Sequence, residues 1–318
     1  MARQKNTIVS VSMPAETAES IKKIATSKGE SVSGMITGLA SQIAESDENS
    51  PVIIPIMSHK GGVAKTTTAG NLSICLAELG YKVLAIDLDG QANLTDDIYG
   101  FDVDDRDSIT AVMLTKSGSR KKLSQVIVKT RFKNLDLVPS TLSHDNIDSA
   151  LILETTGEVT LRLSRAIEVL MGSSTYDYII IDCPPGLGMN VTNAILAMRV
   201  GSSKSFTLIP AKTAGSAIKG VKNTIDVIEQ IAEERRLRPQ HYYVLWTMVD
   251  TRSKILERAY EEAAEEIDEV PFLETTIPLR VDVQNGDLLN MPVVESSPRG
   301  TASQAYRKLA KEIEGLTQ

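Results

Sequence analysis

The chain has 318 residues, 42% of them hydrophobic, and a formal net charge of −7, which fits a large globular domain with an appendage and opposes non-specific DNA affinity on average. No apolar run approaches a membrane-spanning length, and the polar N-terminus lacks a signal-peptide core, so we expect a cytoplasmic protein with no membrane partner. The two cysteines, Cys75 and Cys183, lack CxxC spacing, which excludes a disulfide framework and argues against a cysteine-held metal.

Residues 1–45 carry a pattern of their own. Residues 7–13 alternate polar and apolar side chains, as a strand does. Pro14 then opens a helical pattern that Gly29 interrupts, and Ser33 is positioned to cap a second helix. Strand, helix and helix in this order resemble the ribbon-helix-helix fold of small DNA-binding dimers.

That resemblance implies a dimer whose paired strands enter the major groove, with Ser10 and Ser12 facing the bases. The segment carries no excess of basic residues, so a plain dimerisation arm remains an alternative. Either interpretation requires a partner, because a lone strand leaves its backbone groups unpaired. Residues 46–50 are polar and predict a short linker to a domain over residues 51–318.

From residue 51 onward, apolar strand-like runs alternate with helical patterns. The predicted strands are Val52–Met57, Lys82–Ile86, Leu135–Val138, Tyr178–Ile181, Ser205–Ile209, Tyr242–Met248 and Pro271–Thr275. Helical periodicity is clearest over Thr160–Met171, Ala217–Glu234 and Lys254–Ile267, and residues 102–133 read as short rim helices. This alternation predicts an α/β fold with a doubly wound, mainly parallel sheet.

The first strand leads into a glycine-rich loop, residues 58–68 (SHKGGVAKTTT), and then a helix. Such a loop directs backbone N–H groups at a phosphate, and the helix N-terminus adds positive potential. Lys65 is the point charge for the β- and γ-phosphates, and the Thr66 hydroxyl can ligate Mg²⁺. The loop therefore predicts a P-loop NTPase. We expect the nucleotide to contact Gly61, Gly62, Val63, Ala64, Lys65, Thr66 and Thr67.

A second lysine, Lys60, precedes the two glycines, and this resembles the deviant Walker A loop of the ParA/MinD ATPases, K-G-G-V-G-K-T-T. In that family the early lysine reaches across a dimer interface to the partner's nucleotide. Ala64 stands where the family usually has glycine. If that position needs a positive φ, alanine costs about 1–2 kcal/mol and turnover is expected to be slow.

Two further strands end in carboxylates, Asp87 and Asp89 after the second and Asp182 after the fourth. Ligands of open α/β sheets bind outside the carboxyl ends of strands. The segments D-L-D-G-Q-A-N-L-T and I-I-I-D-C-P-P-G resemble the family's water-positioning and Walker B segments. The resemblance implies that Asp89 positions the attacking water and that Asp87 and Asp182, with Thr66, organise Mg²⁺.

Two later segments resemble the family's adenine-binding segments. Met248 ends the Trp246 strand, and Pro278 lies in T-T-I-P-L. The resemblance implies that both lie near the base, although a core methionine is an equal alternative for Met248. The candidates for contact with DNA are Lys219, Lys222, Arg252, Lys254, Arg258 and Arg280.

The leading hypothesis is therefore a Mg²⁺-dependent partition ATPase. ATP closes a homodimer, the dimer binds nucleoid DNA, and a ParB-type adaptor on a plasmid or other cargo triggers hydrolysis.

A second hypothesis is an ATP-switched transcriptional regulator that reads operator DNA through residues 1–45. A MinD-like membrane positioner is disfavoured. The C-terminal helical pattern is short, carries Glu312 and Glu314 among its polar residues, and has Tyr306, Leu309, Ile313 and Leu316 on one face for packing on the domain.

Overall fold

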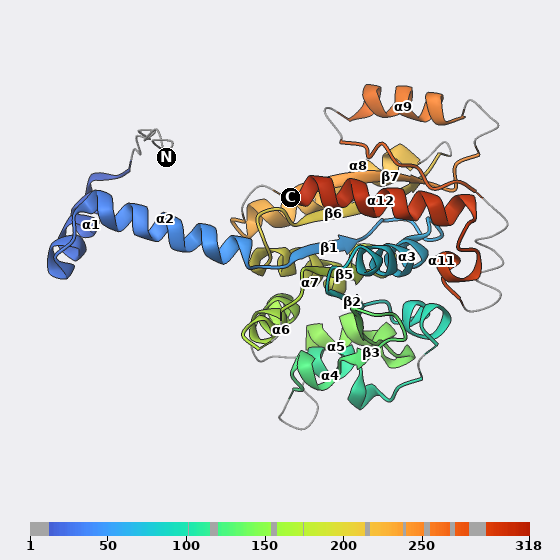
Figure 1. Cartoon of the computed structure of the whole chain (residues 1–318), viewed down its shortest axis with the longest axis horizontal. Coiled ribbons are helices and arrows are strands. Elements are labelled where there is room, and N and C mark those ends of the chain that lie inside the picture. The colour runs from blue at the N-terminus through green and yellow to red at the C-terminus, as the bar shows by residue number, and fades with distance from the viewer. Residues whose placement is uncertain are drawn as a thin grey trace. The chain divides into compact units, whose positions relative to one another are not determined.

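Figure 1 shows the computed structural model of the chain. It describes residues 13–100, 102–114, 120–153, 158–173, 175–213, 217–237, 240–250, 255–267, 271–279 and 291–318. The chain divides into two compact units, Met1–Asn49 and Ser50–Gln318. No helix among these residues combines the length and apolarity needed to span a membrane.

The first unit contains α1 (Ala15–Lys28) and α2 (Val32–Glu48). Gly29 ends α1 in the left-handed region (φ 71°), and its neighbour Glu30 donates back to the Ala25 carbonyl at 3.0 Å. The cap expected at Ser33 is wrong. α2 begins one residue earlier, and the Ser31 hydroxyl accepts the Gly34 N–H at 2.9 Å. Because α2 continues to Glu48, most of the expected linker is helical.

The apolar positions expected inside this unit are only partly covered. Ala25 and Met35 are buried, but Ile24 and Leu39 are 49% and 52% exposed. Residues 7–12 of the expected strand, with Ser10 and Ser12, lie outside the described residues, and Met13 is in neither a strand nor a helix. Two helices that leave large aliphatic side chains exposed lack a complete core of their own.

The second unit is built on a seven-stranded sheet of described residues in the order β3-β4-β2-β5-β1-β6-β7 (Figure 1). The strands are β1 (Val52–Ile56), β2 (Val83–Asp87), β3 (Val128–Lys129), β4 (Leu135–Val138), β5 (Tyr178–Asp182), β6 (Phe206–Lys212) and β7 (His241–Thr247). All neighbours are parallel except β3 and β4. Six predicted strands, with small shifts at their ends, and the doubly wound sheet are thus confirmed.

One predicted strand, Pro271–Thr275, is wrong. This segment makes only an isolated bridge, between Phe272 and Val244 of β7. The short antiparallel strand β3 was not expected. Two residues carry no readable alternation, and β3 is defined by pairing with Asp136 and Leu137 of β4.

Helices cover both faces of the sheet. One face packs on α3 (Lys65–Glu78), α11 (Val293–Ser296) and α12 (Thr301–Thr317), with Leu72 and Tyr306 fully buried. The other packs on α6 (Arg162–Met171), α7 (Met189–Ala197), α8 (Ala217–Glu234) and α9 (Ile255–Glu266). The shorter α4 (Ile109–Met113) and α5 (Ile147–Leu153) complete the second layer. The helices predicted from periodicity are confirmed within two residues at each end.

The C-terminal helix α12 packs on the domain, as its sequence predicts. Tyr306, Leu309 and Ile313 are fully buried in the layer shared with α3, whereas Leu316 near the C-terminus is 40% exposed. The apolar face of α12 is thus used inside the domain.

Candidate functional site

The glycine-rich loop joins β1 to α3 at the carboxyl edge of the sheet. Two side chains from other elements hold its backbone. The Thr224 hydroxyl of α8 accepts the His59 N–H at 3.1 Å, and the Thr247 hydroxyl at the end of β7 donates to the Val63 carbonyl at 3.0 Å. Thr247 also reaches the Ala211 carbonyl at 3.2 Å. The loop is therefore anchored from both sides before any ligand is present.

The two lysines of the loop lie in different surroundings. Lys65 is 7% exposed, and its ammonium donates to the Lys60 carbonyl at 3.3 Å, inside the curve of the loop. Lys60 is half-buried, and its aliphatic chain lies over Gly220 of α8, where a β-carbon would meet Lys60 Cε at 3.3 Å. Lys65 is thus aimed into its own loop, while Lys60 lies along the neighbouring helix of the same chain.

The backbone at Ala64 is left-handed, with φ 62° and ψ 37°. Gly62 also has a positive φ of 67°, which costs glycine nothing. Position 64 therefore does have a positive φ, and its alanine adopts a backbone conformation that favours glycine. Ala92, after Asp89, is also left-handed at φ 53°. Both loops at this edge thus carry strain of the kind found at functional sites.

The carboxylates converge as the sequence predicts. Asp87 and Asp182 stand opposite each other in register on β2 and β5, and both are fully buried. The oxygens of Asp87 accept the Asp89 N–H at 3.1 Å and the N–H and hydroxyl of Thr95 at 3.0 and 2.7 Å. Asp89 is 7% exposed and accepts the Gln91 N–H at 3.0 Å, which turns the loop back on itself.

Asp182 has the surroundings expected of a cation ligand. Both its carboxylate oxygens are buried without a well-formed hydrogen bond among the described residues. Burial, and then the charge of Asp87, raise the pKa of Asp182 well above its ordinary value, although the Thr66 hydroxyl and Lys65 act in the opposite direction. Burial likewise raises the pKa of Asp87 to about 7. An uncompensated buried carboxylate beside a hydroxyl fits Mg²⁺.

No cluster of three or more His, Cys, Asp or Glu side chains with metal-holding geometry occurs among the described residues. The expected Mg²⁺ ligands, Thr66, Asp87 and Asp182, include only two such side chains. Mg²⁺ in phosphate sites takes its remaining ligands from water and phosphate oxygens.

The two segments expected at the base lie together. Val249 pairs with Pro278 in an isolated parallel bridge, and the Ile277 N–H donates to the Trp246 carbonyl at 2.8 Å. Pro278 is buried, whereas Met248 is half-buried with a left-handed φ of 53°. Met248 is thus not a fully buried core methionine. Contact of either residue with a base stays a prediction.

The candidates for DNA contact are only partly described. Ser10, Ser12, Arg252, Lys254 and Arg280 lie outside the described residues. Lys219 and Lys222 of α8 and Arg258 of α9 are exposed. Their exposure is what a DNA contact requires and also what any surface charge shows.

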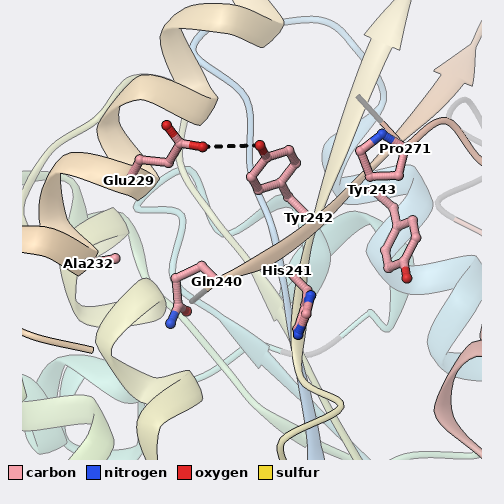
Figure 2. A pocket seen from close by; sticks show the side chains of 7 residues that line it. All are labelled: Glu229, Ala232, Gln240, His241, Tyr242, Tyr243 and Pro271. Atoms are coloured by element: carbon pink, nitrogen blue, oxygen red, sulfur yellow. Dashed lines mark hydrogen bonds between the residues drawn. The ribbon is translucent and has the colours of Figure 1, made fainter. Parts of the chain in front are cut away.

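A hollow of about 400 Å³ is lined by Glu229, Ala232, Gln240, His241, Tyr242, Tyr243 and Pro271. Figure 2 shows these side chains from close by. The Tyr242 hydroxyl donates to Glu229 at 3.1 Å. The hollow lies at the amino end of β7, so it belongs to the opposite edge of the parallel sheet from the glycine-rich loop.

Sequence reasoning missed three residues that support the site. Thr95 lies in the segment D-L-D-G-Q-A-N-L-T and Thr247 in the predicted strand Tyr242–Met248. Neither pattern indicates the hydrogen bonds of these hydroxyls to Asp87 and Val63. Thr224 lies more than 150 residues from the loop in sequence and carries no local signal. The packing of α8 against β6 brings it to His59.

Comparison with known proteins agrees with this geometry. The family described as "AAA domain" matches residues 52–240. The sporulation initiation inhibitor protein Soj of Bacillus subtilis is 31% identical over 82% of this chain and 97% of its own length. The chromosome partitioning protein ParA of Caulobacter vibrioides is 28% identical over 82% of this chain and 93% of its own.

Among solved structures, the septum site-determining protein MinD of Pyrococcus horikoshii, complexed with Mg-ADP, superposes with a TM-score of 0.64. It is 28% identical, and the match covers 84% of this chain and 97% of that protein. The family model covers more than half of the chain, and Soj is over 30% identical along almost its whole length. The chain belongs to the ParA/MinD-type P-loop ATPases.

Proposed function

We propose that this protein is a Mg²⁺-dependent ATPase that partitions DNA cargo by cycling between an ATP-bound homodimer and a nucleotide-released state. The observation that carries the proposal is Lys65 and Thr66 beside the buried Asp182 carboxylate, which has no well-formed hydrogen bond among the described residues. The relatives support the choice of process, since they include chromosome partitioning proteins and MinD.

Each residue then has a defined role in phosphoryl transfer to water. The loop N–H groups and Lys65 bind the β- and γ-phosphates, and Thr66 and Asp182 hold Mg²⁺, with Asp87 ordering the surroundings. The metal neutralises charge that develops on the phosphate oxygens. Asp89 orients the attacking water. Positioning and electrostatic stabilisation account for the rate, so strain at Ala64 is expected to affect turnover more than binding.

Lys60 distinguishes this ATPase from one that works as a monomer. In the proposed dimer it leaves Gly220 and contacts the γ-phosphate bound to the other protomer. DNA then lies along basic side chains that include Lys219, Lys222 and Arg258, and a ParB-type adaptor accelerates hydrolysis. The proposed site of action is the nucleoid.

The test is ATP hydrolysis with and without non-specific duplex DNA, at low and moderate salt, for wild type and Lys60→Ala. We expect weak activity that DNA raises several-fold and that the variant loses, while equilibrium ATP binding persists. Lys311→Ala, an exposed lysine of α12 that belongs to neither the glycine-rich loop nor the proposed DNA contacts, is the control for loss of a lysine. Hydrolysis by Lys60→Ala at the wild-type rate overturns the dimer mechanism.

A second candidate is an ATP-switched transcriptional regulator that acts through residues 1–45. The exposed Ile24 and Leu39 of the two-helix unit favour it, because such a unit needs a partner to complete its core. Deleting residues 1–45 separates the two proposals. Loss of sequence-specific operator binding with ATPase activity and non-specific DNA binding intact supports the regulator; unchanged dimerisation and DNA binding leave the segment without this role.

A further inference from the structure

The backbone of Leu88, between Asp87 and Asp89, is held at both of its polar atoms. Its N–H donates to the Asp182 carbonyl at 2.9 Å. Its carbonyl accepts a hydrogen bond from the side-chain amide of Asn190, in the first turn of α7, at 3.1 Å. Because α7 follows the Pro184-Pro185-Gly186 turn after Asp182, Asn190 ties together the two loops that carry the aspartates.

The orientation of the Asn190 amide follows from its neighbours. Asn190 is 3% exposed, and its Nδ2 lies 3.1 Å from both the Leu88 carbonyl and His144 Nε2. A carbonyl only accepts, so Nδ2 must face it, and His144 Nε2 is then an acceptor. The His144 proton lies on Nδ1, which donates to the Thr110 hydroxyl at 3.1 Å. The Asn190 Oδ1 is buried without a partner among the described residues, so the donors alone fix the amide.

His144 is suited to hold this arrangement at neutral pH. It is fully buried, and burial lowers its pKa to about 3. The imidazole therefore stays neutral and keeps Nε2 as an acceptor. Asp105 is the charged group that acts in the opposite direction on the imidazole, and burial outweighs it.

The same turn of α7 is held by Asp148 of α5. The two carboxylate oxygens of Asp148 accept the N–H groups of Met189 and Asn190, each at 3.0 Å. This satisfies two of the free donors at the start of the helix. The approach requires glycine at position 188, where a β-carbon would lie 1.9 Å from Asp148 Oδ2.

We propose that Asn190, held by His144 and Asp148, is a positioning residue that latches the Asp89 loop to the first turn of α7. The latch makes the loop after β2 and the turn after β5 move as one body. Its role in turnover rests on the proposed ATPase function. The hydrogen bonds of Asn190 to described residues go to Asp148, Leu88 and His144 and not to the glycine-rich loop. Breaking the latch is therefore expected to misplace Asp89 while leaving nucleotide binding intact.

Asn190→Asp is the sharpest test. The variant keeps the shape but sets a carboxylate oxygen against the Leu88 carbonyl, which breaks the latch. We expect kcat to fall about tenfold or more, with KM for ATP within about twofold. The matched control is Asn193→Asp, one turn further along α7. Asn193 is also fully buried, but its amide bonds to Val159, Leu163 and Met189. The control is expected to lose comparable thermal stability without the kcat loss.

A second pair of variants avoids burying a charge. Gly188→Ala displaces Asp148 from the turn and is expected to reproduce the kcat loss. Gly172→Ala is its control, because a β-carbon there meets only the Val169 carbonyl at 3.5 Å. If Gly188→Ala and Asn190→Asp fold and keep the wild-type kcat, or if Asn193→Asp loses kcat equally, the proposal is overturned.

Hydrogen exchange provides a measurement that does not require hydrolysis. In nucleotide-free Asn190→Asp, the amides of Asp89 and Thr95, which both donate to Asp87, are expected to exchange about tenfold faster. They should be unchanged in Asn193→Asp. Failure of wild type to hydrolyse ATP would refute the proposed function alone, and unchanged exchange at both amides would refute the latch.

Discussion

Asp87 and Asp182 face each other in register across β2 and β5, and both side chains are fully buried. Two carboxylates that are close together and shielded from water cannot both be ionised without a large electrostatic cost, unless a cation compensates their charge. At pH values between the ordinary and the raised pKa, the folded, nucleotide-free protein therefore keeps protons on these carboxyls that the unfolded chain releases. This relationship connects the strand pairing directly to a pH-dependent stability.

The first prediction is the sign of that dependence. The pKa of Asp87 is raised from 3.8 to about 7 by burial, and that of Asp182 is raised as well. Because the folded state binds the extra protons, these groups destabilise the fold as pH rises from about 4 to about 7. We expect the melting temperature of the nucleotide-free protein to fall less over this range in Asp182→Asn than in wild type. Equal slopes contradict the prediction.

The second prediction concerns Ala64. Replacing alanine by glycine at a left-handed position removes a cost of about 1–2 kcal/mol, offset in part by the greater freedom of glycine in the unfolded chain. We expect Ala64→Gly to raise the free energy of unfolding by up to about 1 kcal/mol, and the melting temperature by about 2–4 °C. ATP turnover should rise with it.

The control is Ala77→Gly, inside α3, which should lower the free energy of unfolding by about 0.5–1 kcal/mol. Destabilisation by Ala64→Gly contradicts the strain assigned to φ 62°. The same change at Ala92 tests whether the loop after β2 carries similar strain.

The third prediction tests the anchoring of the glycine-rich loop by β7. Thr247→Val removes the hydroxyl bonded to the Val63 and Ala211 carbonyls and keeps the shape of the fully buried side chain. We expect a loss of about 1 kcal/mol of stability and a several-fold weaker affinity for ATP, measured by calorimetry. Thr207→Val on β6 is the control. Among the described residues its hydroxyl reaches only the Met198 sulfur, at 3.9 Å, so affinity should be unchanged.

The parts of the fold and of the candidate site that could be predicted are those indicated by a local sequence pattern. The glycine-rich loop and the aspartates at the ends of β2 and β5 were confirmed in place, because motif and strand adjoin in sequence. The segment Pro271–Thr275 looked like a strand because it is apolar, but it makes only an isolated bridge to β7. The bonds of Thr224 to His59 and of Asn190 to Leu88 join residues over 100 positions apart, and no periodicity indicates them.

The fourth prediction tests the composite site through mixed dimers. Lys60 lies over Gly220 in its own chain, so its reach to a partner's nucleotide depends on dimer formation. Neither Lys60→Ala nor Asp89→Asn alone should hydrolyse ATP. A mixed dimer contains one site with Asp89 from one chain and Lys60 from the other. Random pairing of equal amounts of the two variants makes half of the dimers mixed. Each mixed dimer has one intact site out of two, so the mixture should show about a quarter of the wild-type ATPase activity.

The control mixture combines Lys65→Ala with Asp89→Asn. Both residues serve the nucleotide bound to their own chain, so no dimer of these two variants has an intact site and activity should stay absent. Recovery in the first mixture and not in the second requires Lys60 to act across the interface. Absence of recovery in both, with dimers verified by light scattering in ATP, would mean that Lys60 acts within its own chain, where its contact with Gly220 already holds it beside the glycine-rich loop.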